Sequence, residues 1–205
     1  CFRAVDFDIR VTGSDQVMLI MDKSGSMAWS SKSDTAEVCG NSIDDDSDGT
    51  VDESDCGDAR IEFTQAAARA FIDLQTNVGI EAGLMEFDDG NTLIRQIDPL
   101  SAANANAFKT DIDAITPNGN THIGDALNAA EPDFSRVAAV GRNRTAYLMT
   151  DGYNTGGVAP EEGAARLDDI GVRVHVIPAG TDVDSVQLAG TAAASGTLDL
   201  TGPSV

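Results

Sequence analysis

The chain has 205 residues, 41% hydrophobic and 23% charged, which suits one folded domain rather than a disordered chain. Its 34 acidic residues outnumber 13 basic ones and give a formal net charge of −21. Phosphate backbones and anionic lipid surfaces would repel such a chain. Nucleic-acid binding and membrane binding are therefore disfavoured, and cations are the natural partners, although strong acidity is also typical of a saline habitat.

Hydrophobic patterning along the chain predicts alternating strands and helices. Residues 16–21 form a continuous apolar run, which is typical of a strand buried on both faces of a parallel sheet. Helical spacing of apolar residues follows at 60–75, and Ser101 is a suitable cap for a helix that ends near Ala114. The other predicted strands are 79–87, 92–97, 145–149 and 172–177, the other helices are 123–130, 160–170 and 184–194, and a short extended piece lies at 198–200. This order predicts an α/β fold with a doubly wound, mostly parallel sheet flanked by helices, and a hairpin at 79–97.

The domain organisation follows from local composition. Residues 1–14 are expected to be an N-terminal extension, and 15–205 the folded domain. Residues 30–58 are polar and acidic, with no Lys or Arg between Ser33 and Ala59, and are expected to form an inserted loop. The short apolar run at the start of the domain cannot span a bilayer, so no direct membrane insertion is expected.

Two of the three cysteines, Cys39 and Cys56, bracket the acidic part of this insertion. A disulfide between them would stabilise the fold by about 3 kcal/mol on the loop-entropy model, and it would imply an oxidising compartment. A reduced pair in a cytosolic protein is the alternative. Cys1 is left over, and lipidation, a bridge to another chain or a pairing with a further segment are all open for it.

Polar residues follow two of the predicted buried strands directly. Asp22 opens the sequence Asp22-Lys-Ser24-Gly-Ser26, and Asp151 follows the strand at 145–149 after Thr150. Because ligands bind at the carboxyl ends of strands in such folds, these groups and Thr121 are expected to converge. All of the donors are hard oxygens, which favours Mg²⁺, Mn²⁺ or Ca²⁺ over zinc or copper. The predicted metal ligands are Asp22, Ser24, Ser26, Thr121 and Asp151.

These residues resemble the metal-ion-dependent adhesion site of von Willebrand factor type A (vWA) domains. Residues 17–27 resemble the first strand and loop of that family, residues 120–127 its threonine loop, and Thr150-Asp151-Gly152 its third motif. The resemblance covers about residues 15–200 apart from the insertion. It implies that Ser24, Ser26 and Thr121 coordinate the metal directly, and that Asp22 and Asp151 act mainly through bound water.

In that family an Asp or Glu from a partner completes the coordination of the metal, so the resemblance implies a protein partner that presents a carboxylate. The expected function is an extracellular, metal-dependent adhesion domain of a bacterial surface protein, pilus or filament. The alternative is a structural subunit of such an assembly, whose metal sites bind neighbouring copies. An intracellular chelatase or chaperone component is disfavoured by the cysteine-closed acidic loop.

The insertion carries a second candidate metal site. Counted from Asp44, carboxylates fall at alternate positions and Gly49 stands at the sixth, which is the calcium-loop pattern with Asp55 in place of the usual final Glu. The predicted Ca²⁺ ligands are Asp44, Asp46, Asp48, Thr50 through its carbonyl, Asp52 and Asp55. The unit is similar to calcium-binding repeats of bacterial surface proteins and to thrombospondin type 3 repeats, although it lacks a further Cys near Ser47. A solvated acidic loop is the alternative.

Catalysis is not expected. A Ser/His/Asp hydrolase would have to use Ser24 with His122 and one of the two aspartates, but no Gly-x-Ser-x-Gly sequence surrounds Ser24. The serines are better explained as metal ligands, so we predict a protein that is not an enzyme.

Overall fold

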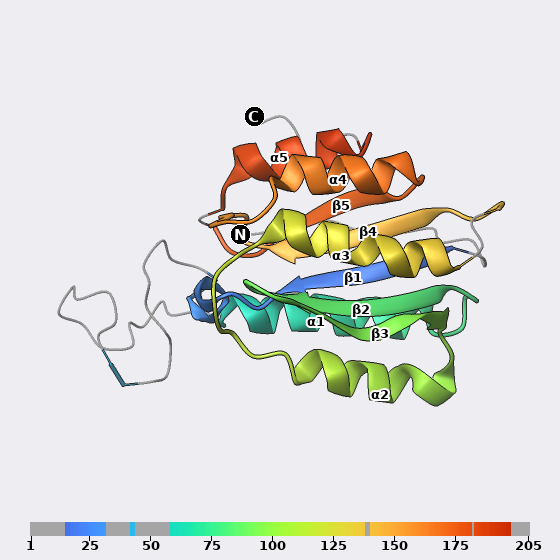
Figure 1. The fold of residues 1–205 in the computed structure, drawn as a ribbon. Helices are drawn as coiled ribbons and strands as arrows, with labels where there is room; N and C mark the ends of the chain where they lie inside the picture. The colour runs from blue at the N-terminus through green and yellow to red at the C-terminus, as the bar shows by residue number, and fades with distance from the viewer. Residues whose placement is uncertain (1–14, 32–41, 44–57, 138–139, 182, 198–205) are drawn as a thin grey trace, which may run out of the picture.

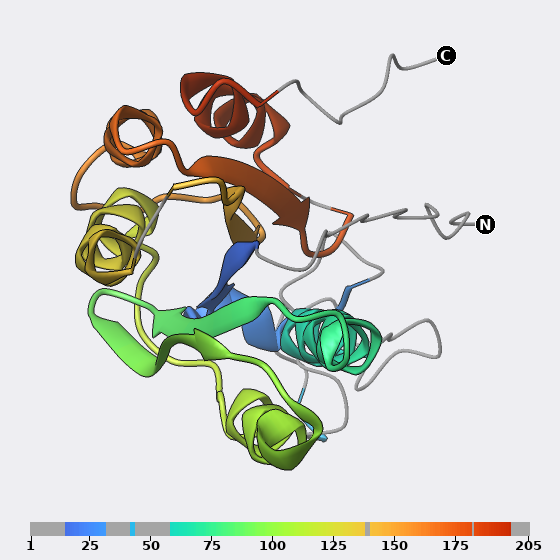
Figure 2. The same cartoon turned by 90° about the vertical axis from the view of Figure 1, so that its right-hand side faces the viewer.

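The structure of the chain is a computed structural model that describes residues 15–31, 42–43, 58–137, 140–181 and 183–197. Within these residues a five-stranded sheet has the order β3-β2-β1-β4-β5, with helices on both faces (Figures 1 and 2). All neighbouring strands are parallel except β2 and β3, which are antiparallel. The elements are β1 (Gln16–Asp22), η1 (Gly25–Ala28), α1 (Arg60–Gln75), β2 (Glu81–Phe87), β3 (Asn91–Pro99), α2 (Ala102–Asp113), α3 (Ile123–Arg136), β4 (Arg144–Thr150), α4 (Pro160–Asp169), β5 (Arg173–Pro178) and α5 (Ser185–Ala194). The predicted doubly wound, mostly parallel α/β class is confirmed.

Strand β1 lies at the centre of the sheet and is buried at all seven of its positions. Side chains alternate between the two faces of a strand, so Val17 and Leu19 pack in the core shared with α1 and α2, whereas Met18 and Ile20 pack in the core shared with α3 and α4. Both faces therefore need apolar side chains, which is why the sequence of β1 shows no alternation. Polar groups are placed at the end of the strand instead.

The predicted hairpin and the capped helix after it are both present. Strands β2 and β3 pair antiparallel around a turn in which Gly90 N donates a 2.7 Å hydrogen bond to Asp88 Oδ1. Helix α2 begins after Ser101, whose backbone N–H donates a 2.8 Å hydrogen bond to Asn104 Oδ1. Helix α1 begins and ends at the predicted residues, and α2 packs beside it.

Helix α3 is longer than predicted, because it continues through Pro132 to Arg136 instead of ending near residue 130. Proline removes one backbone donor from a helix, but tertiary bonds hold the turn that follows. Asp133 Oδ2 accepts a 2.6 Å hydrogen bond from Ile97 N of β3, and Arg136 donates to both Asp133 and Ile97 O. The sequence pattern of the helix alone does not contain these contacts.

Several predictions lie outside the described residues: the N-terminal extension, the extended piece at 198–200 and most of the insertion. The two ends of the insertion are described. Ser30 and Ala59 form an antiparallel bridge, and Ser31 N donates a 3.1 Å hydrogen bond to Asp58 O. Among the helices that the structure describes, none has the length and apolar character that a membrane span requires.

Candidate metal-binding site

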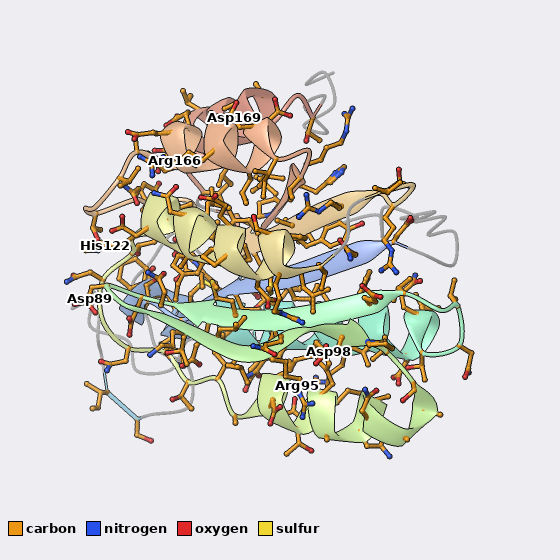
Figure 3. The ribbon with its side chains drawn as sticks, turned by 45° about the vertical axis from the view of Figure 1, so that its right-hand side comes forward. Asp89, Arg95, Asp98, His122, Arg166 and Asp169 are labelled. Carbon is orange, nitrogen blue, oxygen red and sulfur yellow. The ribbon has the colours of Figure 1, made fainter. Side chains whose placement is uncertain are left out.

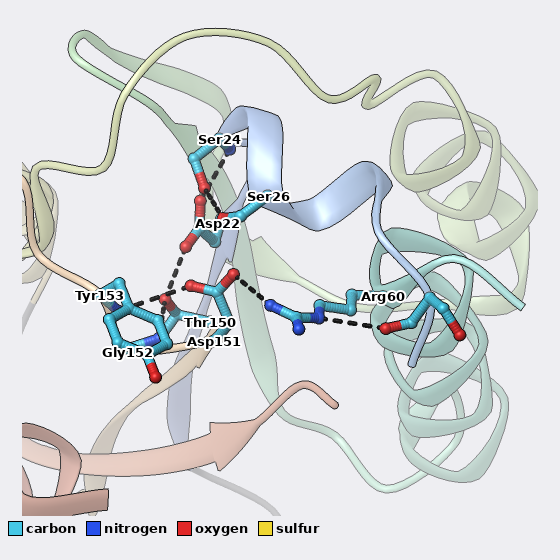
Figure 4. Close-up of polar contacts among 9 residues, drawn as sticks. Asp22, Ser24, Ser26, Arg60, Thr150, Asp151, Gly152 and Tyr153 are labelled. Carbon is cyan, nitrogen blue, oxygen red and sulfur yellow. Dashed lines mark hydrogen bonds and ion pairs between the residues drawn. The ribbon is translucent and has the colours of Figure 1, made fainter. Parts of the chain in front are cut away.

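Strands β1 and β4 are parallel neighbours that end at the same edge of the sheet, and both ends carry buried polar residues (Figure 4). Met21 lies opposite Met149, so the next residues, Asp22 and Thr150, are adjacent. Thr150 Oγ1 donates a 2.5 Å hydrogen bond to Asp22 Oδ2. Asp22, Thr150 and Asp151 are each 0% exposed. Apolar β-strands thus place two carboxyl groups where ligands bind in α/β folds.

The loop after β1 turns back over the end of the strand. Ser24 N donates a 2.7 Å hydrogen bond to Asp22 Oδ1, which fixes the carboxylate of Asp22. The short helix η1 then brings Ser26 next to Ser24, with 3.2 Å between their hydroxyl oxygens. Ser24 is buried and Ser26 is partly exposed. Asp22, Ser24 and Ser26 therefore offer their oxygens in one place.

Thr121 reaches the same place from the loop that precedes α3. Two backbone hydrogen bonds tie this loop to the loop after β1: Gly25 N donates to Gly119 O at 3.0 Å, and Asn118 N donates to Lys23 O at 2.5 Å. Thr121 itself is buried. These contacts join residues that are far apart in the chain, so the spacing of the three sequence motifs does not predict them.

Thr155 and Asn154, which sequence analysis did not single out, hold Thr121 against the loop after β4. Thr155 Oγ1 accepts a 2.9 Å hydrogen bond from Thr121 N, and Thr155 N donates a 2.8 Å bond to Thr121 O. Asn154 Oδ1 accepts a 2.9 Å bond from Ile123 N in the first turn of α3. Both backbone groups of Thr121 are thereby satisfied. The available signal was the polar run that follows Asp151-Gly152 in the sequence.

A hollow of about 380 Å³ lies over the converging loops. Its lining combines polar and aromatic side chains from three segments of the chain. The lining residues are Ser26, Trp29, Thr121, Tyr153 and Thr155. Two predicted metal ligands therefore face a space that a small ligand or a partner's side chain can enter.

No sequence motif indicates the residue that pairs with Asp151. Arg60, the first residue of α1, is 0% exposed, and its Nη1 donates a 2.9 Å hydrogen bond to Asp151 Oδ2 (Figure 4). Arg60 Nε donates to Ser30 O at 3.3 Å, and the guanidinium carbon lies 5.5 Å from the ring centroid of Trp29. A single arginine after a long acidic stretch matches no motif, so only the folded chain reveals this ion pair.

The electrostatics of the site favour a cation. Burial raises the pKa of the Asp22 carboxyl to about 7; the hydrogen bond from Thr150 opposes this increase, and the negative charge of Asp151 adds to it. Arg60 neutralises one of the two buried carboxylates, so the site keeps one net negative charge when all three groups are ionised, and this charge attracts a cation. The geometry and the charge therefore fit a bound cation.

The donor set indicates which cation fits. Within the residues that the structure describes, no group of three or more His, Cys, Asp or Glu side chains is placed to hold a metal ion. The site would therefore depend on hydroxyl oxygens as much as on carboxylates. Hard divalent cations such as Mg²⁺ accept such ligands together with bound water, whereas structural zinc sites use Cys and His.

His122 follows Thr121 and lies beside Asp125 and Gly156. Its Nδ1 lies 3.6 Å from Asp125 Oδ2, and its Nε2 packs against Gly156. Figure 3 shows His122 and Asp89 at the same end of the molecule, whereas Arg95 and Asp98 lie farther along β3, beside α2. The hydrogen bonds of the serine hydroxyls in the described structure do not involve an imidazole.

The predicted calcium loop and the predicted Cys39–Cys56 disulfide lie outside the described residues. They stay predictions from the sequence. What the structure adds is the position of the ends of this segment. Trp29 lines the hollow, and its neighbour Ser30 is bridged to Ala59, so the two ends of the predicted insertion lie beside the candidate site.

Comparisons with known proteins place the chain among relatives. The uncharacterized protein YwmC of Bacillus subtilis (strain 168) is 34% identical over 84 residues, which are 41% of this chain and 37% of that protein. The chain thus spans well under half of the curated relative it matches. Proximal thread matrix protein 1 from the mussel byssus, with a zinc-occupied MIDAS motif (the metal-ion-dependent adhesion site), superposes with a TM-score of 0.64 at 21% identity, over 92% of this chain and 41% of that one.

A manganese-loaded TRAP protein of Plasmodium vivax superposes with a TM-score of 0.64 at 17% identity, over 95% of this chain and 67% of that one. Identities this low establish a shared fold only. The sequence model of the family described as von Willebrand factor type A domain matches residues 45–198, which include Thr121 and Asp151 but begin after Ser26. The chain therefore belongs to the von Willebrand factor type A domain family.

Proposed function

We propose that this protein is an extracellular, non-enzymatic binding domain that holds a partner's Asp or Glu side chain through a divalent cation. The single observation that carries the proposal is the convergence of Asp22, Ser24, Ser26, Thr121 and Asp151 below a hollow that Ser26 and Thr121 line. In this proposal the three hydroxyl groups hold Mg²⁺, or Mn²⁺ or Ca²⁺ in its place, and the cation supplies a Lewis-acidic position for an external carboxylate.

The two aspartates would not bind the cation directly. Both oxygens of Asp22 accept hydrogen bonds, from Ser24 N and from Thr150 Oγ1. Asp151 is paired with Arg60 and also lies near Tyr153 N. Carboxylates engaged in this way would act through bound water, which would leave the cation more electrophilic towards a carboxylate from outside.

The proposal that the protein is not an enzyme is supported by the surroundings of the serines and of His122. Ser24 Oγ has Ser26 Oγ as its hydrogen-bond neighbour, and the imidazole of His122 packs beside Asp125. A general base within hydrogen-bond distance of a nucleophile is what hydrolysis would require. The extracellular location rests on the predicted disulfide, and a metal-binding role is in keeping with the zinc-occupied and manganese-loaded members of the same fold.

Calorimetric titration of chelator-treated protein with Mg²⁺ or Mn²⁺ tests the proposal. The titration is done in an Asp46→Ala background, which removes a predicted ligand of the calcium loop. Thr121→Ala should abolish cation binding at the site and binding of an aspartate-containing peptide. Thr110→Ala is the matched control, since the Thr110 hydroxyl only bonds to Asn106 O within α2.

Cation binding that survives Thr121→Ala would contradict the proposed site. Peptide binding that does not depend on the cation would contradict the proposed mechanism. If the cation instead drove self-association, measured by sedimentation velocity, the alternative role in a surface assembly would be supported.

We also propose that Asp44, Asp46, Asp48, Thr50, Asp52 and Asp55 bind one Ca²⁺ in the insertion, closed by a disulfide between Cys39 and Cys56. The proposal is supported by the spacing of these residues in the sequence alone. It predicts a second calorimetric event with Ca²⁺ that Asp46→Ala removes and Thr121→Ala leaves in place. A single event that only Thr121→Ala removes would contradict it.

A further inference from the structure

The candidate site contains a buried positive charge in addition to its two carboxylates. Arg60, Asp22 and Asp151 are each 0% exposed, and Arg60 Nη1 donates to Asp151 Oδ2 at 2.9 Å. With all three groups ionised, the guanidinium cancels one carboxylate and leaves one net negative charge instead of two. A divalent cation at the site would then leave a surplus positive charge in a place that water does not screen well.

The position of the guanidinium is fixed from several sides. Its Nε donates to Ser30 O, and its carbon lies over the ring of Trp29. Gly180, in the loop after β5, is the fourth neighbour: a Cβ there would lie 2.9 Å from Arg60 Nε, and the φ of +99° favours glycine. The positive charge is therefore built into the fold, and it does not depend on a mobile surface side chain.

We propose that Arg60 is an internal counter-ion that keeps the divalent cation weakly held until an anionic group of the partner joins it. This inference rests on the proposed metal-dependent function and adds to it. The guanidinium repels the cation and so lowers its affinity for the empty domain. An external carboxylate neutralises the surplus charge, so cation and carboxylate strengthen each other's binding by the same factor.

An arrangement without Arg60 would behave differently. Two unpaired aspartates would bind Mg²⁺ or Mn²⁺ strongly on their own and would gain less from a third carboxylate. Arg60 shifts this balance from binding of the cation alone to joint binding of the cation and the partner. The domain would then bind the cation tightly only when the partner's carboxylate binds with it.

The test is a Mn²⁺ titration by calorimetry with acetate present or absent, again in the Asp46→Ala background. Acetate serves as the simplest carboxylate probe. We expect acetate to raise the Mn²⁺ affinity of the parent protein by about tenfold or more. Arg60→Met should bind Mn²⁺ about tenfold more tightly without acetate and respond to acetate less than about threefold. Arg60→Lys keeps the charge and should behave like the parent.

Arg144→Met is the matched control, because Arg144 is also a buried arginine but bonds to the carbonyl oxygens of Phe134 and Ile170 instead of a carboxylate. It should leave both Mn²⁺ titrations unchanged. An Arg60→Met protein with the parent's Mn²⁺ affinity and acetate response would overturn the role of Arg60 and leave the metal site intact. A parent protein that binds no Mn²⁺ under either condition would overturn the proposed function itself. If Arg60→Met does not fold, the parent still decides, since an acetate effect below about threefold contradicts the inference.

Discussion

Two buried arginines lie at opposite ends of the sheet, and they differ in their hydrogen-bond partners. Arg60 lies at the carboxyl end of β1 and β4 over the ring of Trp29, and Arg144 begins β4 at the other end over the ring of Phe134. Within the described structure each leaves one side-chain nitrogen without a hydrogen-bond partner. Arg60 pairs with a buried carboxylate, whereas Arg144 donates to backbone carbonyls.

The difference teaches that burial of an arginine does not reveal its role. At the amino end of the sheet, burial lowers the pKa of Arg144, and its hydrogen bonds satisfy carbonyl groups at the ends of helices α3 and α4. This role is structural. At the carboxyl end, the charge of Arg60 sits among the candidate metal ligands, where it affects what the site can bind.

The largest expected effect is the loss of stability when either arginine is replaced. Arg60→Met leaves Asp151 buried without its partner and should lower the free energy of unfolding by about 3–5 kcal/mol. Arg144→Met leaves only carbonyl oxygens unpaired and should cost about 1–3 kcal/mol. Urea denaturation of chelator-treated protein measures both. Because Mg²⁺ stabilises any folded protein that binds it, added Mg²⁺ should stabilise all three proteins, and Arg60→Met more than the parent or Arg144→Met. Equal stabilisation of the two variants would remove the contrast between the two ends.

A second prediction concerns the close packing of the first turn of α3 against the backbone that precedes α4. A Cβ on Gly124, in the first turn of α3, would lie 2.3 Å from the carbonyl oxygen of Val158 and 2.6 Å from that of Ala159. Gly124→Ala should therefore destabilise the protein by about 1–3 kcal/mol, despite the better helix propensity of alanine. Thermal unfolding measures the loss.

Gly90→Ala is the control for Gly124→Ala. A Cβ on Gly90 meets only Asp88 Oδ1, at an ordinary 3.5 Å, so the stability change should stay within about 0.5 kcal/mol. Similar losses in the two variants would mean that the space around Gly124 adapts. The loop that carries Thr121 would then not depend on this close packing.

A smaller effect is expected from the clamp on Thr121. Thr155→Val keeps the shape of the side chain but removes the hydroxyl that bonds to Thr121 N, so the free energy of unfolding should fall by about 1 kcal/mol. Mg²⁺ affinity should fall too, because Thr121 is held less firmly. Thr110→Val, which removes a hydroxyl from an exposed position of α2, should change neither quantity. Unchanged Mg²⁺ affinity in Thr155→Val would show that Thr121 does not need the clamp.

The fold was accessible from the sequence because its main signals are local. The apolar run of β1, the spacing within α1 and the cap at Ser101 each involve neighbouring residues. The predicted end of α3 was wrong because the contacts that extend this helix are not local. The bonds from Asp133 and Arg136 to Ile97 span residues far apart in the chain, and they hold the helix beyond Pro132.

The candidate site likewise contains residues that local motifs predict and residues that they do not. The structure places Asp22, Ser24, Ser26, Thr121 and Asp151 together, and all five stand in short motifs at the ends of predicted elements. The residues that position or neutralise them were not predicted. Arg60 and Asp151 are separated by 91 positions in the chain, and no short motif connects them. Motifs can indicate candidate ligands, whereas counter-ions and clamps depend on the tertiary structure.

The smallest expected effect comes from β5, away from both arginines, where His175 packs beside the ring of Tyr147. Burial, and then the positive charge of Arg173, lower the pKa of His175 below its usual 6.5. As the pH falls below about 6.5, the unfolded chain takes up the proton first, so the stability from neutral His175 is present above that pH and is progressively lost below it. Because the side chain is only half-buried, we expect under about 1 kcal/mol.

Comparison of His175→Gln with the parent by urea denaturation between pH 5 and 8 isolates this contribution, because other titrating groups, including Asp22, cancel in the difference. The parent should lose stability relative to the variant as the pH falls. A difference that is constant with pH would mean that His175 titrates alike in the folded and unfolded chains. The pH response of the metal-free domain would then have to come from other groups, of which the buried Asp22 at the carboxyl end of the sheet is the first to test.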